Sequence, residues 1–497
     1  MTFFEAFAKG AAVVAAWCSL SFAAASAAPP LLDASHEWFS VLIEVAGLPP
    51  DAPPTPVSCP LDCRAVAEKL GAKGAVDERT LRLFCLAPGG REFEQPVQFL
   101  CQDQPAAKSR QFLPGTVPGV SYIAEYAAGE VVATPHVKGA LWWIARCNPE
   151  GRPRYRLRFG VLRRGRTIQV PYPPHDLRMF DEAGRATPVP YFPRMQIRPQ
   201  WPLLGTLDIT DNGSRVTTYH VGPAWDRRAA DEPVIRRPFF YPVNGPQGIS
   251  LTELGKPHDP TGRHRHHYSL WIAHNNVGGH NFWAEQGGII AHRQIELLED
   301  GPVFCRLAVR TVWRDGPTEC LDERRSLTVF QAGEGFRCMD LDLQFSPAGK
   351  QAVELGRTSF GFLAVRVAQS MTPFDGGGEI LNANGQRNEQ NAHLQHAAWL
   401  DQSGPITSEA WAGIAMLDHP RNVNHPTGWH CRNDGWAGAS FNLDGPYRIE
   451  IGKPLHLRYR LVLHAGTAEE AKIEGHWKGY AAEPSVRVGE PQREAER

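Results

Sequence analysis

Three stretches in the C-terminal half alternate between apolar and polar residues over most of their length, and this alternation constrains the fold more than any other feature. They begin at Val303, Phe336 and Leu455 and read VFCRLAVRTVWRD, FRCMDLDLQFSP and LHLRYRLVLHAG. Successive side chains of a strand point to opposite faces of a sheet, so this period of two predicts strands with one apolar face. Such strands are typical of antiparallel sheets stacked as a sandwich. We therefore predict an all-β fold built around an antiparallel β-sandwich.

The distribution of strand patterns along the 497 residues predicts two β units. The alternating stretch RYRLRFGVLRRG closes an early group of short apolar runs, which predicts a small β-sandwich accessory domain over residues 35–166. Residues 167–201 are rich in proline and form the expected linker. Residues 202–482 are then the main sandwich domain.

The end of the chain combines a predicted helix with a charged tail. Thr467 and Glu470 have the spacing of a capping box and precede AEEAKIEGHWKGYAA, which indicates a helix. Residues 483–497 are charged, and we expect them to be disordered.

The first 27 residues have the pattern of a signal peptide. An apolar run from Ala11 to Ala25 follows Lys9 and ends in Ala25-Ser26-Ala27, a small-x-small cleavage pattern. No later stretch is long and apolar enough for a membrane helix. The formal net charge of -1 gives no electrostatic case for binding nucleic acid or an anionic membrane. We predict an exported protein, periplasmic or extracellular, that is cleaved near Ala27 and has no membrane span.

The cysteines suit an oxidising compartment. Candidate disulfides join Cys59 with Cys63, or Cys85 with Cys101. The Cys59-x-x-x-Cys63 spacing also resembles half of a zinc site. No second pair follows at metal spacing, so a disulfide or plain buried thiols are preferred.

Residues 237–285 hold six of the nineteen histidines, placed among aromatic residues and amides. On a strand, His264 and His266 share one face with Tyr268. His267 then points to the other face. Two imidazoles so spaced can bind a divalent metal or act as general acid and base. The alternative is a basic loop in solvent, because arginines interleave with the histidines.

The segment VGGHNFWAE, which ends at Glu285, places a carboxylate close to Trp283. A carboxyl group in an aromatic setting has a raised pKa and can serve as general acid. A surface glutamate at the end of a strand explains the same pattern. Asn275, shortly before this segment, is a candidate for binding substrate hydroxyls.

Residues 417–436, LDHPRNVNHPTGWHCRNDGW, concentrate polar side chains beside tryptophan. The prolines predict a loop. Amides, imidazoles and a guanidinium next to an aromatic face are well suited to binding a sugar. The alternative is a structural turn in which Asp418 and Asn422 satisfy backbone groups. The candidates in this segment are Asn422, His425, Trp429, His430 and Arg432.

Four segments resemble the PmoA-like family of unknown function, bacterial proteins commonly labelled "methane oxygenase PmoA". FYPVNGP (Phe240–Pro246) is similar to the family's aromatic-Tyr-Pro-x-x-Gly-Pro opening, and VGGHNFW to its Val-Asn-Gly-x-x-Phe-Trp segment. RHRHHYSLW resembles Asp-His-Pro-His-His-Arg-Ser-Leu-Trp and departs from it at Arg263, Arg265 and Tyr268. HPRNVNHPTGWHCR (His419–Arg432) keeps the late family signature.

This resemblance covers about residues 236–479. It implies an exported β-rich domain similar to the galactose mutarotase-like sandwiches, acting in polysaccharide breakdown. We therefore expect the main domain to be a supersandwich of that kind.

The leading hypothesis is a secreted carbohydrate-active enzyme, a lyase, hydrolase or epimerase, with a saccharide as its ligand. His266 or His267 and His425 are the expected acid and base, and Glu285 is a further catalytic candidate. The residues expected to bind the saccharide are Trp271, Asn275, Asn422, Trp429, His430 and Arg432.

Two other functions stay open. A non-catalytic glycan-binding or envelope protein can use the same residues without turnover. A metal-dependent oxygenase needs His264, His266 and a carboxylate as ligands of a divalent metal.

Overall fold

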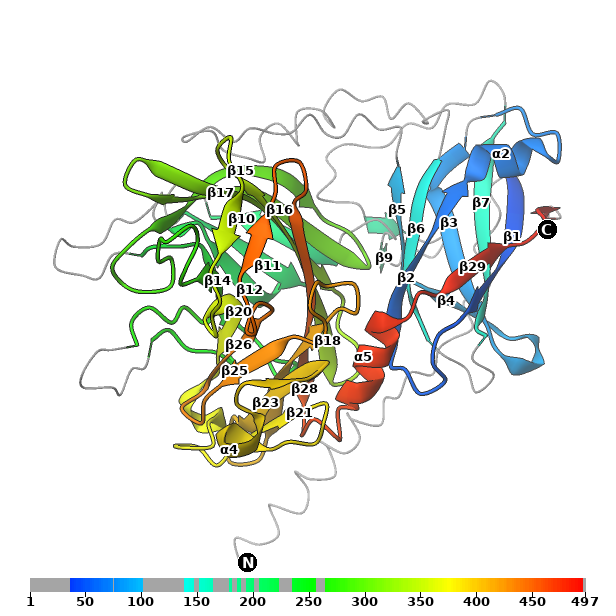
Figure 1. The fold of residues 1–497 in the computed structure, drawn as a ribbon. Helices are drawn as coiled ribbons and strands as arrows, with labels where there is room; N and C mark the ends of the chain where they lie inside the picture. The colour runs from blue at the N-terminus through cyan, green and yellow to red at the C-terminus, as the bar shows by residue number, and fades with distance from the viewer. Residues whose placement is uncertain are drawn as a thin grey trace, which may run out of the picture.

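The computed structural model contains a small N-terminal β unit and a large β-sandwich, with helix α5 (Ile473–Ala481) between them (Figure 1). No helix in the described part of the chain is long and apolar enough to cross a membrane. The signal peptide, Arg263 and most of the predicted linker lie outside the described residues. The structure describes residues 36–74, 76–101, 138–146, 152–163, 178–180, 186–188, 194–200, 205–222, 235–255 and 264–494.

The N-terminal unit packs a six-stranded sheet against a three-stranded one around its own apolar core, which includes Trp143, Tyr155 and Phe159. The six-stranded sheet runs β29-β1-β7-β3-β4, with β30 also paired to β1, and the other runs β2-β6-β5. Their bounds are β1 (His36–Ala46), β2 (Thr55–Asp62), β3 (Val76–Leu86), β4 (Glu92–Gln95), β5 (Val97–Cys101), β6 (Lys138–Ala145), β7 (Arg154–Leu162), β29 (Ser485–Val488) and β30 (Gln492–Arg493).

The expectation that residues 483–497 are disordered is wrong for those that the structure describes. Val45 of β1 pairs with Val486 and Ile43 with Val488, so the end of the chain adds an antiparallel edge strand to the N-terminal unit. In Figure 1 the C-terminal strand lies beside β1 on the side of the molecule away from the sandwich. The N-terminal unit is therefore built from both ends of the described chain.

The predicted disulfides do not form. Cys59 and Cys85 are free thiols, so neither of the two candidate pairings is present. Cys59 points into the core of the N-terminal unit, and its burial raises the pKa of the thiol to about 11. The thiol is therefore an inert apolar packing group at neutral pH.

The sandwich consists of a nine-stranded and an eight-stranded antiparallel sheet that enclose one large core. The nine-stranded sheet runs β10 (Met195–Pro199), β11 (Thr206–Asp211), β12 (Ser214–His220), β13 (Phe239–Val243), β14 (Leu270–His274), β20 (Gly361–Arg366), β26 (Trp436–Ser440), β25 (Gly428–Cys431) and β22 (Gln395–His396). The eight-stranded sheet runs β15 (Ile289–Glu299), β16 (Phe304–Asp315), β17 (Thr318–Phe330), β18 (Phe336–Pro347), β28 (Leu455–Ala465), β24 (Trp411–Asp418), β23 (Trp399–Pro405) and β21 (Glu379–Asn382).

The remaining elements are short. They are β8 (Arg178–Phe180) paired with β9 (Ala186–Pro188), β19 (Val353–Leu355) paired with β27 (Tyr447–Ile449), helices α2 (Cys63–Glu68) and α4 (Asn388–Ala392), and the 3-10 turns η1 (Pro88–Gly90) and η4 (Gln369–Met371). The predicted fold class is confirmed: the chain is mainly β, with a large antiparallel sandwich preceded by a smaller β unit.

The strands β16, β18 and β28 are those that the alternating stretches predict. On β18, Met339 and Leu341 point into the core, while Asp340 on the opposite face forms an ion pair with Arg460 of β28 at 2.6 Å. Arg460 in turn lies 4.5 Å from the ring centroid of Tyr480 on α5. The polar face of the eight-stranded sheet is thus partly covered by α5.

The two units are joined by hydrogen bonds as well as by apolar contacts. Gln98 of β5 accepts from the backbone nitrogens of Val303 (3.3 Å) and Phe304 (3.1 Å) through Oε1. A Cβ added to Gly301 would lie 2.2 Å from that oxygen, so only glycine permits this approach. Trp142 of β6 meets Phe304 edge to face, with 5.4 Å between ring centroids.

Candidate functional site

The outer face of the nine-stranded sheet carries an apolar cluster that is separate from the sandwich core. Strand register builds it: Trp271 of β14 pairs with Ala364 of β20, which pairs with Gly438 of β26. The small residues Ala364 and Gly438 leave space beside Trp271 for larger rings from the neighbouring positions. The cluster's buried members are Phe239, Trp271, Ala273, Trp283, Ala364 and Trp436.

Three tryptophans form the floor of this face. Trp283 lies 5.5 Å from Trp271 and 5.3 Å from Trp436 between ring centroids, and all three are buried. Phe360 adds a half-buried ring, 5.5 Å from Trp283. Rings at these separations pack in tilted geometry and form a rigid support for the side chains above them.

The histidines of residues 264–267 lie on this floor, but not on a strand. Residues 264–266 form a turn, in which the nitrogen of His267 donates to the oxygen of His264 over 3.0 Å, and β14 begins only at Leu270. The prediction that His264 and His266 share a strand face is therefore wrong. The turn instead gathers all three imidazoles, with ring centroids 4.5 Å apart for His266 and His267 and 5.2 Å for His264 and His267.

His267 is the buried member of the turn. Its ring stacks on Trp271 at 5.3 Å, and its Nδ1 accepts a hydrogen bond of 3.0 Å from Nη1 of Arg366. A guanidinium can only donate, so His267 holds its proton on Nε2. Burial, and then electrostatic repulsion from His266 and Arg366, lowers the pKa of His267 well below its ordinary value. The imidazole is therefore neutral at physiological pH.

The half-exposed histidines each face a carboxylate. Nδ1 of His266 lies 3.8 Å from Glu285, and Nε2 of His264 lies 3.8 Å from Asp434. Asp434 is also held by Arg366, whose Nη2 donates to its backbone oxygen over 2.8 Å. Two imidazole–carboxylate pairs thus stand side by side, with 6.4 Å between the rings of His264 and His266. Imidazoles beside carboxylates are the usual means of moving protons near neutral pH.

Arg237 is a fully buried guanidinium of the same region. Its Nη2 donates to the backbone oxygens of Trp283 (2.8 Å) and Ala284 (3.2 Å), and its centre lies 5.3 Å from the ring centroid of Tyr268. Within the described residues, its Nε and Nη1 have no hydrogen-bond partner and it forms no ion pair. Burial lowers the pKa of Arg237 to about 10. Arg237 still carries its positive charge at neutral pH, and this charge further disfavours protonation of His267.

The sequence profile of a family described as "Family of unknown function (DUF6807)" matches residues 206–478, which is more than half of the chain. The chain belongs to this family. The resemblance to the PmoA-like family is thereby corrected, because the segments that suggested it fall inside the match and the family shown is DUF6807.

Comparisons with curated proteins and solved structures give at most weak similarities. No curated protein matches the sequence. One similar solved structure is a heparan sulfate lyase mutant from Pedobacter heparinus, with 10% identity, a TM-score of 0.26 and coverage of 63% of this chain and 39% of that chain. A heparinase III with methylated lysines has 13% identity, a TM-score of 0.27 and coverage of 62% and 42%. A putative kojibiose phosphorylase from the human microbiome has 5% identity, a TM-score of 0.25 and coverage of 59% and 37%. The chain thus spans less than half the length of each. Likeness at this level does not extend to function.

The late DUF6807 segment, residues 419–432, is divided between two places. His430 lies on the floor of the site, 4.0 Å from Trp436 between ring centroids, and its Nδ1 hydrogen-bonds the backbone oxygen of Ser359 at 3.1 Å. Burial lowers the pKa of His430 to about 3, so this ring is also neutral. Arg432 is half-exposed and forms an ion pair with Glu389 at 2.9 Å.

His425 belongs to the other place, against helix α5. Its Nδ1 lies 2.6 Å from Asp418, and its ring stacks parallel to Trp477 at 6.2 Å. Asn422 binds the same Asp418 at 2.7 Å and also the backbone of Arg458, so both serve structural contacts. These neighbours belong to β24, β28 and α5, whereas His267 packs on Trp271 of β14 and Trp436 of β26 in the other sheet. The prediction that His425 acts together with the early histidines is therefore wrong.

Two tryptophans predicted to stack on sugar are inaccessible. Trp429 lies in the sandwich core and donates from Nε1 to the oxygen of Ala397, and Trp271 is covered by His267. Both side chains are fully buried, so neither can meet a sugar ring. Asn275 follows β14 and is half-buried. Its backbone nitrogen donates to the backbone oxygen of Phe360 over 3.2 Å.

Metal binding finds no support in the donor geometry. Across the described ranges, no three His, Cys, Asp or Glu side chains are grouped so that they can hold an ion. His264 and His266 face different carboxylates, as described above, rather than a common point.

Sequence reasoning missed Arg366, Asp434 and Phe360. Arg366 is the single charged residue of β20, GFLAVR, all of whose positions are buried. A lone arginine at the end of a buried apolar strand indicates a buried polar contact, because a buried charge needs hydrogen-bonding partners. Asp434 lay within the segment singled out for its polar residues, but nothing local indicated that it faces His264.

Proposed function

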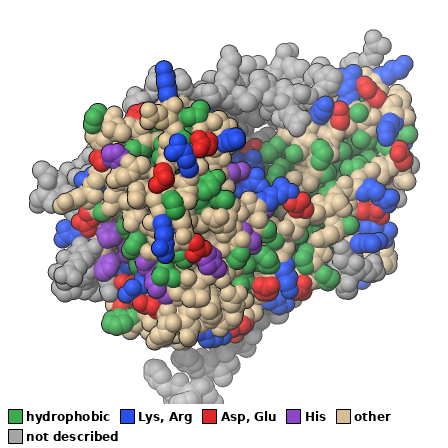
Figure 2. Space-filling model, viewed as in Figure 1, with side chains coloured by type: hydrophobic (Ala, Val, Ile, Leu, Met, Phe, Trp, Pro, Cys, Tyr) green, Lys and Arg blue, Asp and Glu red, His purple; other side chains and the backbone are tan. Residues whose placement is uncertain are grey.

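We propose that this DUF6807 protein is a carbohydrate-active enzyme whose site is the outer face of the nine-stranded sheet at the turn His264–His267. One observation carries the proposal: two partly exposed imidazole–carboxylate pairs, His264–Asp434 and His266–Glu285, stand on a buried aromatic floor. Histidine side chains gather over the sandwich in Figure 2. We also infer that the protein is exported, because its first 27 residues have the pattern of a signal peptide.

The two pairs suit proton transfer in both directions. A neutral imidazole accepts a proton from substrate carbon or hydroxyl, and a protonated one donates to the departing oxygen. Glu285 and Asp434 orient the two rings and stabilise the imidazolium that each step forms. His267 takes no proton at neutral pH, and its role is to fix the turn through Arg366. Lyase, hydrolase and epimerase reactions all need such an acid and base.

Binding of the sugar ring falls to half-buried aromatic side chains. Tyr268 and Tyr241 each keep an exposed part on this face, and Tyr268 stacks on Phe239 at 5.1 Å. Their accessible faces can contact the C–H face of a pyranose, which the buried tryptophans cannot do. Arg432, half-exposed beside His430, is placed to donate to hydroxyl groups.

The test is turnover of a polysaccharide panel by the purified protein, read by ultraviolet absorbance for unsaturated products, by reducing ends and by NMR for epimers. We expect one of the three readouts to respond, and His264→Ala and His266→Ala each to lower kcat by about a hundredfold or more. His280→Ala is the control, because His280 pairs with Asp315 at the surface. Circular dichroism checks the fold of every variant.

A wild-type protein that binds glycans but gives no product by any readout would show a non-catalytic binding protein. Activity that survives in the His264→Ala, His266→Ala double variant would place the chemistry elsewhere. His425→Ala separates these outcomes further: it should lower stability through Asp418 and Trp477 but leave kcat unchanged.

A further inference from the structure

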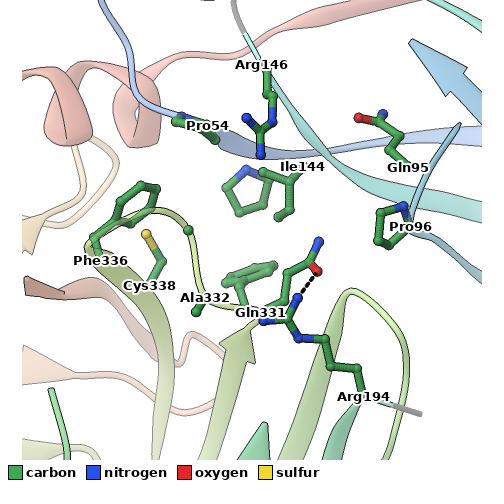
Figure 3. A pocket seen from close by; sticks show the side chains of 13 residues that line it. Pro54, Gln95, Pro96, Ile144, Arg146, Arg194, Gln331, Ala332, Phe336 and Cys338 are labelled. Carbon is green, nitrogen blue, oxygen red and sulfur yellow. Dashed lines mark hydrogen bonds between the residues drawn. The ribbon is translucent and has the colours of Figure 1, made fainter. Parts of the chain in front are cut away.

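A pocket of about 240 Å³ opens between the N-terminal unit and the sandwich (Figure 3). One wall comes from β2, β4, β6 and the residues next to them. The other comes from β17, β18, the turn between them and Arg194, which precedes β10. None of its lining residues belongs to the histidine site described above. The volume lies below the roughly 300–1,000 Å³ of sites for drug-sized ligands, so the pocket suits one small ring.

The charge of the lining is positive. Arg146 and Arg194 line the pocket, and no described Asp or Glu does. Arg194 is neutralised by Asp211, to which its Nε donates over 2.5 Å. Arg146 is exposed and forms no ion pair within the described residues. Figure 3 shows its guanidinium reaching into the pocket from above, opposite Gln331 and Arg194. A guanidinium so placed favours a carboxylate, which it can hold by two parallel hydrogen bonds.

Two amide side chains add uncharged hydrogen-bonding groups. Gln331 accepts from Nη1 of Arg194 over 3.0 Å through Oε1, which fixes its orientation at the pocket floor. Gln95 on the far wall has a buried Nε2 that finds no hydrogen-bond partner among the described residues. A buried amide donor left unpaired costs about 1–3 kcal/mol, so a ligand oxygen that accepts from it is favoured.

The rest of the wall is mostly apolar. Pro54 and Pro96 lie on the side of the N-terminal unit, and Phe336 and Ala332 lie on the sandwich side (Figure 3). Pro56 also lines the pocket. Apolar and aromatic walls with a few convergent polar groups are the usual lining of small-molecule sites, and an aromatic ring such as Phe336 suits the C–H face of a pyranose.

We propose that this pocket binds an acidic monosaccharide unit, a uronate, with its carboxylate on Arg146 and its ring between the prolines and Phe336. Amides from both units contact the hydroxyls, so the ligand bridges the N-terminal unit and the sandwich. The site is separate from the proposed catalytic face and does not depend on it.

Isothermal titration of the full-length protein with glucuronate tests the proposal. We expect binding of glucuronate and at least about tenfold weaker binding of both glucose, which lacks the carboxylate, and acetate, which lacks the ring. Added salt should weaken the glucuronate affinity, because the contact with Arg146 is partly exposed. Absence of glucuronate binding, or equal affinity for acetate or for glucose, would overturn the proposal.

Variants locate the site. Arg146→Gln removes the free charge at an exposed position, and Ala332→Trp fills the pocket without changing its charge. Both should lower the affinity for glucuronate at least about tenfold. Lys350→Gln, an exposed lysine outside the pocket, should leave it unchanged. The His264→Ala, His266→Ala double variant should also bind as the wild type does. Loss of binding in that double variant, with binding retained in Arg146→Gln, would assign the ligand to the catalytic face and refute the pocket.

Discussion

Arg366 and His267 lie 99 residues apart in sequence, yet Nη1 of the arginine donates a 3.0 Å hydrogen bond to Nδ1 of the imidazole, and both side chains are buried. The same guanidinium donates to the backbone oxygen of Asp434. Strand β20 therefore holds both the histidine turn and the loop before β26 in place. The orientation of the partly exposed His264 and His266 depends on this buried contact.

Replacing Arg366 should destabilise the sandwich. Arg366→Met leaves the acceptors on His267 and Asp434 without their donor, and hydrogen bonds to a charged group contribute about 1.5–3 kcal/mol each in favourable cases. We expect the free energy of unfolding in urea to fall by about 2–4 kcal/mol. Arg448→Met, at an exposed position paired with Glu450, is the control and should change it by less than about 0.5 kcal/mol. An unchanged urea midpoint for Arg366→Met would show that the contact contributes no stability.

Stability should fall in mild acid because several histidines are buried in the neutral form. Burial lowers the pKa of His274 to about 4 and that of His476 to about 3, against 6.5 for the free side chain. Below pH 6.5 the unfolded chain binds a proton at each of these positions that the folded chain does not. Above pH 6.5 these histidines do not lower the free energy of unfolding. As the pH falls from 6.5 toward the folded-state pKa, the free energy of unfolding decreases by about 1.4 kcal/mol per pH unit for each histidine.

A matched variant isolates this effect from the carboxylates that also titrate in acid. His476 packs edge to face on Phe336 at 4.5 Å, so His476→Phe keeps an aromatic ring at a buried position. Between about pH 6 and 4, the urea midpoint of the variant should depend less steeply on pH than that of the wild type. The difference should correspond to roughly the contribution of one histidine. Parallel pH profiles for the variant and the wild type would contradict the assignment of a neutral buried His476.

The sandwich could be predicted from sequence because its signal is local. Met339, Leu341 and Leu343 fill the core side of β18, as strict alternation requires, since the period of two is a property of the extended backbone itself. The capping box also forms, with the nitrogen of Thr467 donating to Glu470 over 2.8 Å. The regular helix begins later than expected, because Lys472 has a φ of 55° and separates the capped turn from α5.

The site could be predicted only in part, because its geometry depends on register between distant strands. Composition located His264–His267 correctly at an aromatic face. It could not show that His430 would join that face while His425, five residues earlier, would pack on α5. Arg366 was missed for the same reason: its contact with His267 arises only when β14 pairs with β20.

Glu323 and Arg325 form a buried ion pair on β17. Removing only the arginine should greatly lower the free energy of unfolding. The carboxylate accepts from Arg325 Nε at 2.7 Å and also from Thr311 and Trp313, and both charged side chains are almost fully buried. Arg325→Met leaves Glu323 as a buried charge without its cation, and we expect a loss of about 3–5 kcal/mol in urea unfolding. The double variant Glu323→Gln, Arg325→Met should lose less than Arg325→Met alone. An equal or larger loss in the double variant would contradict an uncompensated charge as the cause.

Removal of the C-terminal strand should loosen the N-terminal unit first. A chain ending at Ala482 lacks β29, whose half-buried Val486 and Val488 pack on the unit's core and pair with β1. Partial burial of two valines contributes about 1–3 kcal/mol, to which the lost backbone hydrogen bonds add. In the truncated chain we expect a lower-temperature calorimetric transition and faster amide hydrogen exchange in β1, with the exchange of β18 unchanged.

Point variants show which part of the strand is responsible. The double variant Val486→Ser, Val488→Ser keeps the backbone pairing and loses only the apolar contact, so it should reproduce roughly half of the truncation effect. Arg487→Gln changes an exposed side chain that pairs with Glu44, and it should have little effect, because surface ion pairs contribute at most about 1 kcal/mol. If the truncated chain kept the melting profile of the full-length protein, β29 would be an adventitious edge strand and the N-terminal unit would be complete without it.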